Sequence, residues 1–82
     1  MKLYKHTNGK CNASGRRIKE LREAAGLSQE QLAGKLQLLG LDTTQKAISR
    51  IETGSRIVPD YELIPFAKVF HVSVNYLLST DD

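Results

Sequence analysis

The chain has 82 residues, of which 40% are hydrophobic and 26% are charged, as in a single small soluble domain. No run approaches the roughly 18 apolar residues of a membrane span, and the N-terminus lacks the apolar core of a signal peptide, so we expect a cytoplasmic protein without membrane contact. The single cysteine, Cys11, excludes an internal disulfide, and with His6 and His71 it matches no zinc-ligand spacing, so no metal is expected.

Positive charge is concentrated in the first part of the chain. Residues 1–58 contain eleven Lys and Arg against five Asp and Glu, whereas residues 59–82 contain one Lys and four acids. This asymmetry favours a polyanionic partner for the first part and a different kind of contact for the acidic end.

The first 14 residues are polar, carry Lys2, Lys5 and Lys10, and show no helical period. We expect residues 1–14 to be a flexible basic arm, with the alternative that the arm lies along phosphates or in a minor groove. A folded domain is expected over residues 15–79, followed by a frayed tail over residues 80–82.

The first helix is predicted over residues 15–25, with Ser14 as its cap. Ile18, Leu21 and Ala25 recur at intervals of three and four and predict its buried stripe. Gly26 stands where a left-handed residue commonly ends a helix.

The second helix is predicted to begin at Gln29, because Ser28 and Gln31 have the spacing of a capping box. Its expected inner face is Leu32, Ala33 and Leu36, and Gly40 stops it. Three further leucines follow that face, and we expect them to pack inward because an exposed group would form a sticky patch. They are Leu38, Leu39 and Leu41.

The third helix is predicted over residues 44–53, with Asp42 or Thr43 as its cap and Gly54 at its end. Ile48 and Ile51 lie on one side of it. The other side carries amides, a hydroxyl and cations but no acid: Gln45, Lys46, Ser49 and Arg50. Arg and Lys bind the acceptors of guanine and Gln binds adenine, so this face suits a DNA major groove.

The last two helices are short. Pro59 and Asp60 open the fourth, for which the expected buried residues are Leu63, Ile64, Ala67 and Phe70. Ser73 caps a fifth helix over about residues 74–79. No strand pattern is long enough to trust, so the predicted fold is all-α, a compact bundle of five short helices.

Four segments in this order resemble one family. They are Arg17-Ile18-Lys19-Glu20-Leu21-Arg22, Gly26-Leu27-Ser28-Gln29-Glu30-Gln31-Leu32-Ala33, Ile48-Ser49-Arg50-Ile51-Glu52-Thr53-Gly54, and Ala67-Lys68-Val69-Phe70-His71-Val72-Ser73 with Leu77-Leu78. From residue 15 to residue 78 the chain resembles the helix-turn-helix domain of the phage-repressor and Cro class, the XRE family.

The resemblance implies contacts between particular side chains and double-stranded DNA. Contacts to bases would come from Gln45, Lys46, Ser49 and Arg50. Contacts to phosphates would come from Gln29, Thr44 and Arg56. Gln29 would act at the start of the second helix, where backbone N–H groups favour an anion.

The resemblance also implies an internal ion pair between Arg22 of the first helix and Glu52 of the third. Such a pair would orient the third helix without touching DNA, and the alternative is two separate surface charges. Between Leu36 and Ile48 the chain is longer than the family pattern, which bears on the angle between the second and third helices.

No nucleophile–base pair, phosphate loop or metal cluster is evident, so we expect no enzyme, no cofactor and no small-molecule ligand. The expected function is that of a sequence-specific transcriptional regulator, a repressor that reads a pseudo-palindromic operator as a homodimer. Val74, Tyr76 and Leu78 are the candidate dimer surface, or else they only close the core. The alternative function is a protein-interaction module on the same fold, such as an antitoxin or anti-repressor.

Overall fold

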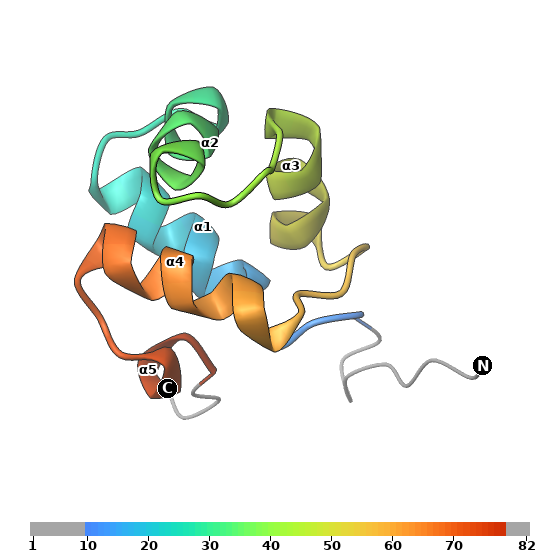
Figure 1. Cartoon of the computed structure of the whole chain (residues 1–82). Helices are drawn as coiled ribbons and strands as arrows, with labels where there is room; N and C mark the ends of the chain where they lie inside the picture. The colour runs from blue at the N-terminus through green and yellow to red at the C-terminus, as the bar shows by residue number, and fades with distance from the viewer. Residues whose placement is uncertain (1–9, 79–82) are drawn as a thin grey trace.

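The computed structural model describes residues 10–78, and within this range the chain forms five α-helices and no strand (Figure 1). The helices are α1 (Gly15–Ala24), α2 (Gln29–Leu38), α3 (Gln45–Thr53), α4 (Asp60–Phe70) and α5 (Val74–Leu78). The predicted all-α bundle of five short helices is therefore confirmed. Most of the expected arm, residues 1–9, and all of the expected tail lie outside the described residues.

In the view of Figure 1, α2 and α3 form the upper part of the molecule, with α1 and α4 beneath them and α5 below α4. α1 packs against α3 and α4, α2 packs against the same two helices, and α5 packs against α4. None of the described helices has the length and apolar character that crossing a membrane requires.

The starts of α2 and α3 are fixed by side-chain caps. Ser28 Oγ accepts a 3.0 Å hydrogen bond from the Gln31 N–H, and Gln31 Oε1 accepts one of 2.8 Å from the Ser28 N–H, which confirms the predicted capping box. At α3 the cap is Thr44, whose Oγ1 accepts from the Ala47 N–H at 3.1 Å. The expected caps, Asp42 and Thr43, were wrong by one or two residues.

At α1, Ser14 stands at the expected N-cap position, but its side chain does not cap the helix. Ser14 is buried and makes no side-chain capping bond. Instead, Asn12 Oδ1 accepts a 2.7 Å hydrogen bond from the Gly15 N–H. This bond satisfies one of the N–H groups that the first turn of a helix leaves without a partner.

The core joins residues of all five helices, including Ile18, Leu32, Ile48, Phe66 and Leu77. On α4 the buried stripe is Leu63, Phe66 and Ala67, spaced at three and four residues as one helix face requires. Phe66 was missed in the sequence, and Ile64 was wrongly assigned to the core, since 52% of its surface is exposed.

The leucines beyond the inner face of α2 do not all pack inward. Leu38 is 87% exposed and Leu39 is 48% exposed, so the expected burial was wrong for both, whereas Leu41 packs partly against the core. Leu36 occupies the inward position on α2. Leu38, two residues later, points to the opposite side because two helical residues span about 200°.

Candidate nucleic-acid interface

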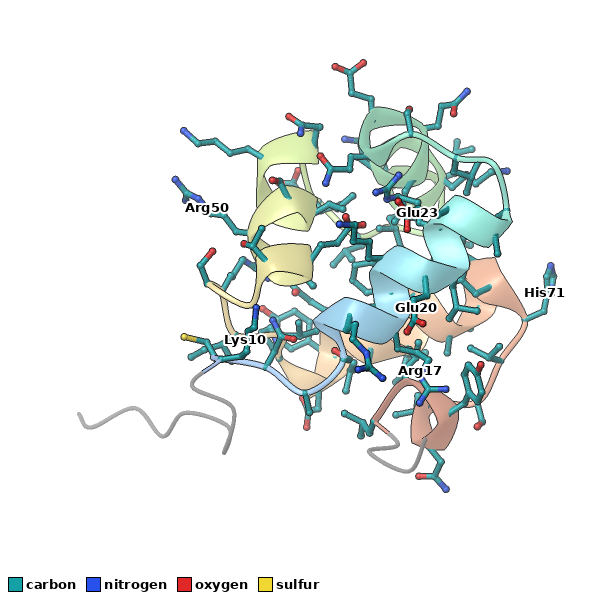
Figure 2. All side chains as sticks on the ribbon, turned by 180° about the vertical axis from the view of Figure 1, so that it is seen from behind. Lys10, Arg17, Glu20, Glu23, Arg50 and His71 are labelled. Atoms are coloured by element: carbon teal, nitrogen blue, oxygen red, sulfur yellow. The ribbon has the colours of Figure 1, made fainter. Side chains whose placement is uncertain are left out.

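α3 has one buried face and one exposed face. Ile48 and Ile51 are buried in the core, which fixes how the helix is turned. Lys46 and Arg50 are exposed on the other face, and Figure 2 shows Arg50 directed away from the body. Within residues 10–78 neither of these two side chains makes a hydrogen bond or ion pair, so both cations are available to a ligand.

A chain of side-chain hydrogen bonds connects the first three helices. The Gln45 Nε2 donates to Gln29 Oε1 at 2.6 Å, and the Gln29 Nε2 donates to Glu52 Oε1 at 3.0 Å. Arg22 completes the chain, since its Nε and Nη2 donate to the two carboxylate oxygens of Glu52 at 2.7 and 3.0 Å. The structure thus joins the expected Arg22–Glu52 pair to two of the residues expected to contact DNA, Gln29 and Gln45.

The Arg22–Glu52 pair is held away from water. The Glu52 side chain is 2% exposed and the Arg22 side chain is 12% exposed, and the Arg22 Nη1 also donates to the Leu27 carbonyl at 2.8 Å. The hydrogen bond to Glu52 raises the pKa of Arg22 above its ordinary value despite the opposing effect of burial. The guanidinium therefore stays charged and fixes α3 relative to α1 and to the turn before α2.

The polar groups at the N-terminal end of α3 keep some of their hydrogen-bonding capacity. An amide has two N–H donors and a carbonyl acceptor, so Gln45 retains one donor and the acceptor while it is bound to Gln29. The remaining N–H donor and carbonyl acceptor of the Gln45 amide match the acceptor and donor on the edge of adenine. Thr44 uses its oxygen as the helix cap, and its hydroxyl proton remains a donor.

The segment before α1 is hydrogen-bonded to the C-terminal end of α3 and to the loop that follows it. The Asn12 Nδ2 donates to the carbonyls of Ile51 at 3.0 Å and Arg56 at 2.8 Å, and the Cys11 N–H donates to the Gly54 carbonyl at 2.8 Å. Residues 10–14, which we expected to be part of a flexible arm, are thus hydrogen-bonded to the domain. The partners of Asn12 are about 40 residues away, so no local sequence pattern indicated this contact.

Two glycines permit this close packing. A Cβ on Gly15 would overlap the Ile51 carbonyl oxygen, which lies directly against α1. Gly54 has a left-handed φ of 81° at the end of α3, and the Lys10 side chain lies over it where a Cβ would stand. Gly15 is therefore required by its close contact, and Gly54 is required both by its contact and by its left-handed conformation.

Arg56, one of the expected phosphate contacts, forms an ion pair with an acid of α4. Its Nη1 and Nη2 donate to the two carboxylate oxygens of Glu62 at 2.8 and 3.1 Å, and this hydrogen bonding raises its pKa. The Glu62 side chain is only 7% exposed, and a carboxylate in that position needs a charged partner. Arg56 is therefore committed to an internal ion pair between the α3–α4 loop and α4.

The residues of the expected dimer surface are placed differently from one another. Val74 packs partly against the core, and Tyr76 and Leu78 are exposed. The Arg17 guanidinium lies 4.5 Å from the centroid of the Tyr76 ring, a cation–π contact between α1 and α5. Over the described part of the chain, no group of three or more His, Cys, Asp and Glu could hold a metal ion.

Two packed helices joined by a turn, with the second presenting an exposed polar face, define a helix-turn-helix protein. A family model described as a helix-turn-helix domain matches residues 14–75, and the chain belongs to this family. The match confirms the resemblance found in the sequence and indicates a DNA-binding regulator. A search of curated proteins finds no match.

Proposed function

We propose that this protein is a repressor that binds double-stranded DNA sequence-specifically, without catalysis, and places α3 in the major groove. The observation that carries the proposal is the exposed face of α3, where Lys46 and Arg50 extend from a helix anchored by Ile48 and Ile51. An α-helix fits the width of this groove, and Lys and Arg bind the acceptors of guanine there.

The side chains proposed to contact DNA then fall into two groups, those that contact bases and those that contact phosphates. Lys46 and Arg50 contact bases at the exposed face, with Gln45 and Ser49 beside them on the same face of the helix. Each well-made base contact contributes about 1–3 kcal/mol of discrimination. Gln29 at the start of α2 and Thr44 before the first turn of α3 donate to phosphates. Lys and Arg side chains displace counterions from the phosphates, so affinity should fall steeply with salt.

One domain of this size reads few base pairs, so we propose a homodimer on a pseudo-palindromic operator. Two copies of α3 would then enter successive major grooves about one helical turn apart. The exposed side chains of Tyr76 and Leu78 on α5 support this helix as the dimer surface, because an aromatic and an aliphatic residue suit the core of a protein interface.

The experiment that tests this function is selection of bound duplexes from a random pool with the full chain. We expect an enriched inverted repeat with half-sites about 10 base pairs apart, and sedimentation of the complex should give two chains per duplex. A pool without any enriched motif would contradict sequence-specific binding, and an enriched motif without symmetry would contradict the homodimer.

A second candidate function is supported by the exposed leucines at the end of α2. Leu38 and Leu39 are large apolar side chains in water, and such residues suit a protein partner. On this account the domain is an interaction module of the antitoxin or anti-repressor kind. Failure of the wild-type chain to bind any duplex at low salt would favour this candidate over the first.

A further inference from the structure

A pocket of about 230 Å³ opens beside the C-terminal end of α3. Its lining comes from the segment before α1, the first turns of α1 and the end of α3: Lys10, Asn12, Ala13, Gly15, Arg16, Lys19, Glu52 and Gly54. Three of these residues are cationic. Glu52 is the one acid in this lining, and its carboxylate is already bound by Arg22 and Gln29. Arg16 also lies 3.7 Å from Glu20, which is outside the lining, so Lys10 and Lys19 supply most of the positive charge of the pocket. We call it the Lys10 pocket.

Lys10 is held at a defined place by the hydrogen bonds between the segment before α1 and the end of α3. The Cys11 N–H donates to the Gly54 carbonyl, and the Lys10 Nζ donates to the Thr53 carbonyl at 3.1 Å. Thr53 is exposed at the last position of α3, and Figure 2 shows Lys10 at this end of the helix. The ammonium therefore lies at the edge of the face proposed to enter DNA.

The two ends of α3 can each approach a DNA strand, because a major groove that admits an α-helix is bordered by both strands. Thr44 is the cap of α3, and Gln29 of α2 is hydrogen-bonded to the first residue of α3, so both lie near its N-terminal end and can reach one strand. At the C-terminal end the expected phosphate contact was Arg56, which is instead bound to Glu62.

We propose that the Lys10 pocket binds a backbone phosphate of the DNA strand that borders the C-terminal end of α3. Lys10 makes the direct contact, and Arg16 and Lys19 add positive charge around the anion. The segment before α1 thereby takes the place that the loop residue Arg56 has in the expectation from the family. The inference rests on the proposed function, because its ligand is the DNA that α3 reads.

The first test compares Lys10→Gln with Lys68→Gln on the selected operator at several salt concentrations. Lys68 is an exposed cation in the last turn of α4 and does not line the pocket, so it is the matched control. We expect Lys10→Gln to weaken binding roughly five- to tenfold and to reduce the slope of log affinity against log salt by about one. A scrambled duplex should lose affinity by the same factor, and Lys10→Arg should restore most of it.

The second test identifies the phosphate. Neutral methylphosphonate linkages are placed one at a time along the operator, and wild-type affinity should fall at a linkage bordering the C-terminal end of α3. Lys10→Gln should be insensitive at that linkage and normally sensitive at the others, since a removed contact cannot be lost twice. Lys19→Gln should show a smaller change at the same linkage, and it keeps the pocket testable if Lys10→Gln does not fold.

The outcomes separate this inference from the proposed function. If wild-type protein prefers the operator but Lys10→Gln and Lys19→Gln have the salt slope and linkage sensitivities of Lys68→Gln, the pocket does not bind phosphate and the inference is overturned. If wild-type protein binds no duplex preferentially, the proposed function fails and the inference fails with it.

Discussion

The guanidinium of Arg22 on α1 binds the carboxylate of Glu52 on α3 through two hydrogen bonds, of 2.7 and 3.0 Å. Glu52 also accepts from Gln29, which in turn accepts from Gln45 at the first position of α3. The orientation of the proposed reading helix is therefore set from outside that helix, by charges and amides on α1 and α2.

Replacing Glu52 by Ala should lower the free energy of unfolding by about 3–5 kcal/mol, because Arg22 is left largely buried without its partner. The control is Glu20→Ala, which removes the exposed Arg16–Glu20 pair at 3.7 Å and should cost less than about 1 kcal/mol. Urea unfolding measures both. Equal small losses for the two variants would show that the buried pair does not hold α3.

The Arg56–Glu62 pair should respond differently to loss of each partner. Arg56→Ala leaves a buried carboxylate unpaired and should cost about 1–3 kcal/mol of stability.

Glu62→Gln leaves Arg56, which is 34% exposed, free to turn outward. We expect this variant to bind all duplexes more tightly and with a steeper salt dependence, measured by gel shift. Unchanged affinity would mean that a released Arg56 does not reach a phosphate.

Gly15→Ala should destabilise the domain by about 1–3 kcal/mol, because the added methyl overlaps the Ile51 carbonyl oxygen and separates α1 from α3. Gly34, in the interior of α2, has open space where a Cβ would stand and has no positive φ. Gly34→Ala should therefore stabilise by about 0.5–1 kcal/mol through helix propensity. Opposite shifts of the thermal midpoint are expected, and a Gly15→Ala variant as stable as wild type would contradict the close approach of α1 and α3.

Leu38→Ala should change the free energy of unfolding by less than about 0.5 kcal/mol, since its side chain is in water. Leu36→Ala, two residues earlier and fully buried, should cost about 2–5 kcal/mol. Denaturant midpoints compare the two. A large loss at Leu38 would place this side chain against the body or against a second chain.

Local sequence signals predicted the elements of this fold well. The capping box at Ser28 and Gln31 predicted the start of α2, and the isoleucine pair predicted which side of α3 is buried. Both signals act within one turn of helix, so the chain itself contains the interacting groups at a fixed spacing.

Local signals did not predict contacts between residues that are far apart in the sequence, or the rotation of each helix about its own axis. The bonds from Asn12 to the end of α3 join residues about 40 positions apart, and the partner of Arg56 depends on how α4 is packed. The exposure of Leu38 and the burial of Phe66 depend on the rotation of α2 and α4 about their axes. Hydrophobicity alone does not define that rotation when apolar residues occupy more than one face.

Lys46 and Arg50 carry the central claim, and the most direct measurement is the ratio of affinities for the selected operator and a scrambled duplex. In Lys46→Ala and Arg50→Ala the ratio should fall roughly 5- to 150-fold for each side chain, which corresponds to about 1–3 kcal/mol of lost discrimination. The melting temperature should not change, because both side chains are exposed and make no hydrogen bond or ion pair within residues 10–78. Lys35→Ala, an exposed cation on α2, should leave the ratio at its wild-type value. A ratio that stays the same in all three variants would contradict base reading by α3.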